Sequence, residues 1–207
     1  MAHAMINPWI TVWTRPRHTI RHLVTYASES ALLPLAAVGG VVQALDRASS
    51  RSLGDTIPFD VILALCGALG PLIGILELYL GSVLISWTGR WIGGNAESDE
   101  IRTAVAWANV PLIGVFVLWI LQTVLLGPEL FTTLTPRLDN SGGLAIGFLA
   151  SALAQITLGI WAFFILLKGL GEVQGFSAWK AFGNVLLSSL VFVVPIGLLV
   201  LLVVALG

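Results

Sequence analysis

The chain has 207 residues, of which 57% are hydrophobic and only 10% are charged, and its mean hydropathy is +0.95. A soluble domain carries about 25% charged residues, so this composition is typical of a polytopic membrane protein. The formal net charge of −1 leaves no basic patch for nucleic acid, which we exclude as a partner. The single cysteine, Cys66, can form no intramolecular disulfide.

The first predicted element is a short interfacial helix near the N-terminus. Asn7 can cap a helix whose first residue is Pro8. The helix and the residues just after it carry aromatic side chains that can anchor at headgroup depth and basic side chains that can lie against anionic lipid. These residues are Trp9, Trp13, Arg15, Arg17 and Arg21. The same segment could instead be a docking surface for a partner protein.

Five apolar runs of about 20 residues follow, and each is long enough to cross a bilayer. They cover residues 26–45, 63–87, 104–126, 144–167 and 181–206. The predicted fold is therefore all-α, with residues 1–25 as a cytoplasmic tail and residues 26–207 as a five-helix membrane domain. Gly70-Pro71 favours a break in the second run, which would leave its outer half as a separate short helix.

The basic residues predict the orientation in the membrane. With the N-terminus in the cytoplasm, seven of the ten Lys and Arg residues lie on the cytoplasmic side: Arg15, Arg17, Arg21, Arg90, Arg102, Lys168 and Lys180. Cytoplasmic loops carry an excess of these residues. We therefore expect a cytoplasmic N-terminus and, after five spans, a C-terminus outside.

Glu77 places a carboxylate deep in the second run. At 100° per residue it shares one helix face with four glycines, namely Gly67, Gly70, Gly74 and Gly81. Small residues let another helix approach closely, so we expect this face to lie in a helix interface rather than against lipid. An ionisable group at this depth costs about 2.5 to 3.5 kcal/mol, which indicates either a functional group or a buried structural partner.

Gln155 in the fourth run is the predicted partner of Glu77. Glu77 lies 13 residues before Arg90, and Gln155 lies 13 residues before Lys168, so the two lie at matching depth. Gln155 and Ser151 also belong to a small and polar stripe at i, i+4 spacing. The predicted Glu77 to Gln155 hydrogen bond has two interpretations: interhelical stabilisation, or a proton or cation site near the midplane.

Two loops are expected on the cytoplasmic side. Gly93 and Gly94 precede an acidic stretch in which Ser98 can cap the next helix. The second loop carries Glu172 and Gln174, and Ser177 can cap the last helix. The two loops could form one surface, where these side chains either contact a partner or stabilise the turn.

Three motifs in this order resemble the Yip (Ypt-interacting protein) domain family. They are Asn7-Pro8-Trp9 with Pro16, Ile92-Gly93-Gly94 with Val110-Pro111, and Gly171-Glu172-Val173-Gln174-Gly175-Phe176-Ser177. The resemblance implies a Yip-type membrane domain. Eukaryotic members are linked to Rab-type GTPases and vesicle formation, but the short tail here resembles the bacterial branch. That branch implies an inner-membrane location without established chemistry, so Rab binding is not transferred.

Two functions from different classes remain. The chain shows no catalytic triad, no zinc motif and no paired carboxylates, so we expect no enzyme, cofactor or metal site. The leading interpretation is a membrane-organising or partner-recruiting protein, whose partners are the lipid bilayer, a second copy of the chain, or a membrane or cytoplasmic protein. The alternative is a small oligomeric ion- or proton-coupled transporter or channel centred on Glu77.

Overall fold

The computed structural model describes residues 7–26 and 29–206, and every regular element in these ranges is helical. The elements are α1 (Pro8–Thr14), α2 (Pro16–Tyr26), η1 (Glu29–Ala31), α3 (Leu32–Ser50), η2 (Leu53–Asp55), α4 (Phe59–Trp91), α5 (Ser98–Ala108), α6 (Val110–Leu126), η3 (Gly127–Phe131), α7 (Pro136–Asp139), α8 (Gly142–Val173) and α9 (Ala178–Leu206). The predicted all-α class is therefore confirmed.

Four stretches within the described residues are long and apolar enough to cross a membrane. They are Phe59–Trp91, Ser98–Phe131, Gly142–Val173 and Ala178–Val204. The helix that replaces the first predicted span, α3, is not among them, because Gln43, Asp46 and Arg47 lower its hydropathy. The chain is thus an integral membrane protein, with four candidate spans among its described residues.

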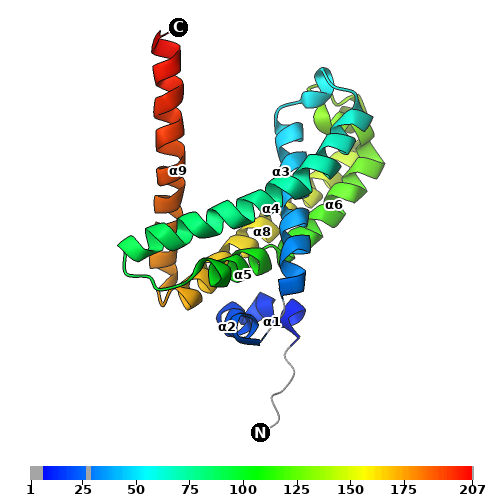
Figure 1. The fold of residues 1–207 in the computed structure, drawn as a ribbon. Coiled ribbons are helices and arrows are strands. Elements are labelled where there is room, and N and C mark those ends of the chain that lie inside the picture. The colour runs from blue at the N-terminus through cyan, green and yellow to red at the C-terminus, as the bar shows by residue number, and fades with distance from the viewer. Residues whose placement is uncertain (1–6, 27–28, 207) are drawn as a thin grey trace.

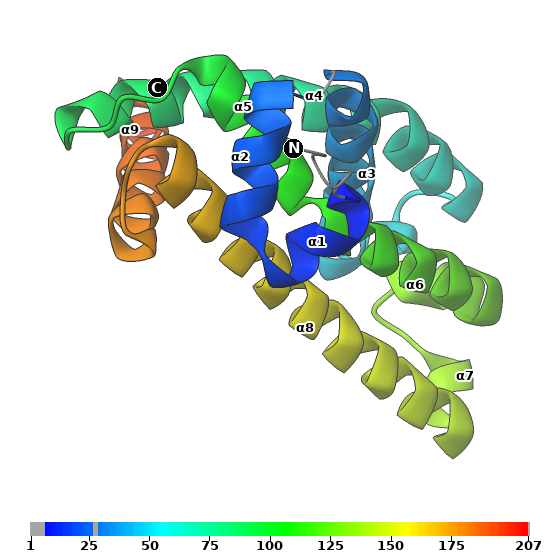
Figure 2. The same ribbon diagram turned by 90° about the horizontal axis from the view of Figure 1, so that it is seen from below.

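The N-terminal helices and the end of α9 lie at opposite ends of the molecule. In Figure 1, α1 and α2 lie at the bottom, and the red end of α9 is at the top. Seen from below in Figure 2, α2 lies beside α5 and α8, against which it packs. Ile20 of α2 is completely buried and belongs to the same hydrophobic cluster as Ile101 and Leu170. The interfacial helix is therefore fastened to the helices above it.

Two sequence expectations about helix ends were wrong. Helix α4 continues through Pro71, so Gly70-Pro71 is not a break. The cap of α5 is Glu97 rather than Ser98: the Glu97 N–H donates to Glu100 Oε2 over 2.9 Å, and the Glu97 side chain accepts in return from the backbone of Glu100. This reciprocal capping box satisfies two of the free donors at the helix start, which one serine cannot do.

Helices α3 and α4 cross at glycines. A Cβ atom added at Gly74 would lie 2.8 Å from the Cα atom of Gly40, and one added at Gly70 would lie 2.8 Å from the Cα atom of Val41. Added Cβ atoms at Gly67 and Gly81 would meet nothing within 4 Å. The predicted glycine stripe therefore forms a helix contact only over its central part, because the two helices diverge on either side of the crossing.

Candidate functional site

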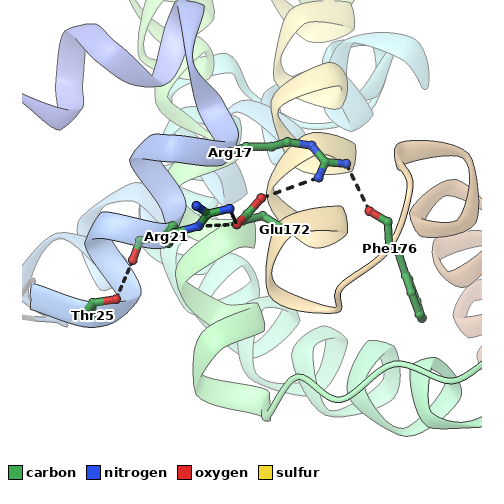
Figure 3. A network of polar contacts seen from close by, with 5 residues as sticks. All are labelled: Arg17, Arg21, Thr25, Glu172 and Phe176. Atoms are coloured by element: carbon green, nitrogen blue, oxygen red, sulfur yellow. Dashed lines mark hydrogen bonds and ion pairs between the residues drawn. The ribbon is translucent and has the colours of Figure 1, made fainter.

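Glu172 connects the last turns of α8 to the N-terminal helix α2. Its carboxylate pairs with Arg17 over 3.6 Å and with Arg21, whose Nε donates to Glu172 Oε1 over 2.6 Å. Arg17 also donates to the carbonyl oxygen of Phe176 over 3.1 Å. Figure 3 shows both guanidinium groups reaching from α2 towards Glu172. One carboxylate with 11% exposure thus holds two arginines from a segment about 150 positions earlier.

This arrangement changes the environment expected for the interfacial anchor. Arg17 and Arg21 contact protein, whereas Arg15 is exposed at the end of α1. The Trp9 ring lies 4.9 Å from the ring of Trp107, and the carbonyl oxygen of Trp13 accepts from the indole of Trp161 over 3.2 Å. Most of the expected lipid anchors therefore also dock the N-terminal helices onto the membrane domain.

The two glycine-containing loops end their helices in the same way. After α4, Gly93 has φ +84° and the N–H of Gly94 donates to the carbonyl of Gly89 over 2.8 Å. After α8, Gly175 has φ +71° and the N–H of Phe176 donates to the carbonyl of Gly171 over 2.7 Å. Each is a Schellman motif, whose left-handed position favours glycine. Gly93 is therefore a helix-ending residue.

Gln174 joins these two loops. Its side chain is 2% exposed; Oε1 accepts from the N–H of Ala96 over 3.3 Å, and Nε2 donates to the carbonyl of Ile85 over 3.3 Å. A Cβ atom at Gly94 would lie 2.8 Å from Gln174 Cδ, so only glycine leaves room for the amide. The structure thus brings Gly94 and Gln174 into contact.

Two further residues of this buried network were not singled out from the sequence. Asn184 of α9 donates to the carbonyl of Ile85 over 3.1 Å and accepts from the hydroxyl of Thr88 over 2.8 Å. Asn184 and Thr88 are both fully buried. A polar amide about one turn into the apolar run 181–206 was the available signal for Asn184. Buried polar groups need such partners, so this network fixes α9 against α4.

Glu77 and Gln155 do not form the predicted pair. Glu77 pairs with Arg47 of α3 over 3.6 Å, and both side chains are about half exposed, at 46% and 56%. Gln155 Nε2 donates to Gln122 Oε1 over 3.0 Å and to the hydroxyl of Ser151 over 3.4 Å. Equal depth in the membrane did not predict a contact between the two side chains, because α4 packs on α3 whereas α8 packs on α6 and α5. Gln155 and Ser151 are thus brought together, without Glu77.

A cavity of about 370 Å³ lies beside Gln155, between α3, α6 and α8. Gln122 and Asp46 line it, and Asp46 accepts from the indole of Trp119 over 3.0 Å. Its polar groups are thus paired with one another. Within the described residues, no group of three or more His, Cys, Asp or Glu side chains is arranged to hold a metal ion.

Comparison with known proteins places the chain in a family. The model of the Yip1 domain matches residues 10–202, which is nearly the whole chain. No curated protein and no solved structure gives a significant match. The matched region contains Arg17, the Gly93-Gly94 loop and the segment from Gly171 to Ser177, which the structure places together. The chain therefore belongs to the Yip1 domain family.

Proposed function

We propose that this protein is a non-enzymatic membrane scaffold that organises its surroundings by recruiting a protein partner to its cytoplasmic side. The partner surface consists of α2, the loop 92–97 and the segment 172–177, and we call it the docking surface. The observation that carries the proposal is the pair of connections made by Glu172 and Gln174. They fasten three segments that are far apart in the sequence into one rigid unit.

The composition of the docking surface suits protein recognition. Its interior is closed by buried hydrogen bonds, so the surface is preorganised and a partner need not order it. Asn95 and Glu97 are exposed on the loop between α4 and α5. Next to the docking surface, the exposed Trp91 lies at the end of α4, with its ring 4.8 Å from that of Trp87. Exposed aromatic and polar groups on a rigid base are typical of binding surfaces.

The proposal includes five membrane crossings, with α3 as the first and the N-terminus in the cytoplasm. The seven basic residues on the proposed inner side support this orientation. In intact cells, an impermeant maleimide should label Ser141→Cys and leave Asn95→Cys unlabelled, both in a Cys66→Ala background. The reverse pattern would place the docking surface outside.

Transport centred on Glu77 gains no support from the structure. Its carboxylate lies on an exposed face beside Arg47 and lines none of the cavities described among these residues. An ion pathway would need such a group to face a protected, polar interior.

Photo-crosslinking in living cells tests the scaffold proposal. A photoreactive residue at Asn95 should give a discrete crosslinked protein, and one at the exposed Leu134, in the loop between η3 and α7, should not. Glu172→Ala should weaken the Asn95 crosslink, because α2 is no longer fastened. Equal crosslinking from both positions, or none from Asn95, would contradict the proposal.

A further inference from the structure

A second cavity, of about 270 Å³, lies where the corner between α1 and α2 meets α8. Trp13 and Pro16 line it from the N-terminal side, and Trp161, Phe164 and Lys168 line it from α8. The indole N–H of Trp161 is already bonded to the Trp13 carbonyl, so the rings present mainly apolar surface. The cavity is therefore apolar over most of its wall and carries one cationic group.

The positive charge of Lys168 is not neutralised by the protein. Lys168 is exposed and makes no ion pair with any residue that the structure describes. The nearest carboxylate along α8, Glu172, lies one turn further and already pairs with Arg17 and Arg21. The cavity thus keeps the positive charge of Lys168.

Along α8, the groups that line the cavity follow the order of the parts of a phospholipid, from the headgroup to the acyl chain. Lys168 lies five residues before the end of the candidate span Gly142–Val173, and in a membrane-spanning α8 this is the end at which lipid headgroups lie. Trp161 lies seven residues, or about 10 Å along the helix, deeper in the apolar layer. An anionic headgroup would meet the lysine first, and an acyl chain would continue along the rings.

We propose that this cavity is a binding site for one anionic phospholipid. Lys168 binds the phosphate group, while Trp161 and Phe164 line the path of an acyl chain and Trp13 with Pro16 closes the opposite wall. The site differs from the general attraction of a basic tail to the membrane, because Arg17 and Arg21 are held by Glu172. The lipid site requires only that α8 spans the membrane, so its test does not depend on the proposed protein partner.

Native mass spectrometry of the full chain in detergent tests the site. The probes are palmitoyl-oleoyl phosphatidylglycerol and the phosphatidylcholine with the same acyl chains. Wild type should bind the anionic lipid more tightly. Lys168→Gln should weaken that binding about fivefold, the factor for about 1 kcal/mol per basic group at an anionic surface. Phosphatidylcholine also carries a phosphate, but its choline cation cancels the headgroup charge, so the same substitution should weaken phosphatidylcholine binding less. Lys168→Arg should keep the preference.

The matched control is Lys180→Gln. Lys180 is the other lysine near this end of the molecule, but its Nζ lies 4.5 Å from the centre of the Phe176 ring, away from the cavity. This variant should bind phosphatidylglycerol like wild type, whereas Phe164→Ala should weaken both lipids. The proposal is overturned if Lys168→Gln keeps the preference, if Lys180→Gln loses it equally, or if millimolar glycerol phosphate displaces the lipid.

Discussion

Replacing Gly74 by alanine should force apart the two helices that cross most closely. The added Cβ would lie 2.8 Å from Gly40 Cα and 2.9 Å from Gly40 N, and it would also contact the carbonyl oxygen of Ala36. All three are backbone atoms, so no side chain can rotate away. Since carbon atoms prefer separations of about 3.5 to 4.0 Å, α3 must move by about 1 Å.

The size of the effect follows from a comparison with Gly81→Ala on the same helix. Both substitutions gain about 1 kcal/mol of helix propensity, which cancels between them. Gly81 has nothing within 4 Å of its added Cβ. The difference is therefore the overpacking cost at Gly74, about 1 to 3 kcal/mol. For a chain of this size, about 2 kcal/mol corresponds to about 4 to 8 °C in Tm.

Thermal unfolding in detergent, followed by tryptophan fluorescence, measures this difference. Gly74→Ala should melt below wild type and Gly81→Ala at or above it. Gly40→Ala should behave like Gly74→Ala, because its added Cβ would lie 2.7 Å from Gly74 Cα. If Gly74→Ala and Gly81→Ala melt together, the close crossing of α3 and α4 does not stabilise the fold.

Three further predictions concern polar contacts. Gln174→Ala should cost about 1 to 3 kcal/mol, because it leaves the buried Ala96 N–H without its acceptor. Gln43→Ala, whose buried Oε1 has no hydrogen-bond partner among the described residues, should cost less when both variants are melted in detergent. Glu172→Ala should speed hydrogen exchange in α2, and Glu77→Ala, which removes only the half-exposed pair with Arg47, should not. The hydroxyl and the N–H of Thr133 donate to Asp55 and hold the pKa of its carboxyl below the ordinary 3.8. This contact, between η2 and the loop after η3, should therefore stabilise the fold above pH 3.8. The stabilisation should be lost as the pH falls through the lowered pKa of Asp55 in the folded protein. Tm measured from pH 5 downwards should therefore fall more steeply for wild type than for Asp55→Asn, and parallel curves would contradict this assignment.

Two capping signals in the sequence predicted helix starts correctly, whereas the Ser98 cap and the Gly70-Pro71 break were wrong. Asn7 caps α1, as its side chain accepts from the N–H of Trp9 over 3.1 Å, and Ser177 accepts from the N–H of Lys180 over 3.2 Å before α9. The hypothesis that the loops with Gly94 and Gln174 form one surface also agrees with their contact. These features depend on spacing within a few residues, or on a polar group that must find a partner at one end of the bundle.

Lateral neighbours of the helices could not be predicted in this way. Depth along two spans places Glu77 and Gln155 at one level, but it does not state which helix lies beside which. The crossing of α3 and α4 brings Arg47 within reach of Glu77, although the two differ in predicted depth. Pro71 likewise shows that a proline can remain inside a long membrane helix, since the bilayer offers its backbone no alternative hydrogen bonds.

Helix α9 is fastened at one end only. Ala181, Asn184 and Ser188 are buried against the neighbouring helices, and no described side chain beyond Ser188 is buried. Its 29 residues would extend about 44 Å, which exceeds a hydrocarbon layer of about 30 Å. With no described helix packed beside it to fix its tilt, the part of α9 beyond Ser188 can adjust its angle to the thickness of the surrounding bilayer. The inclination of α9 is thus a property of the lipid as much as of the protein.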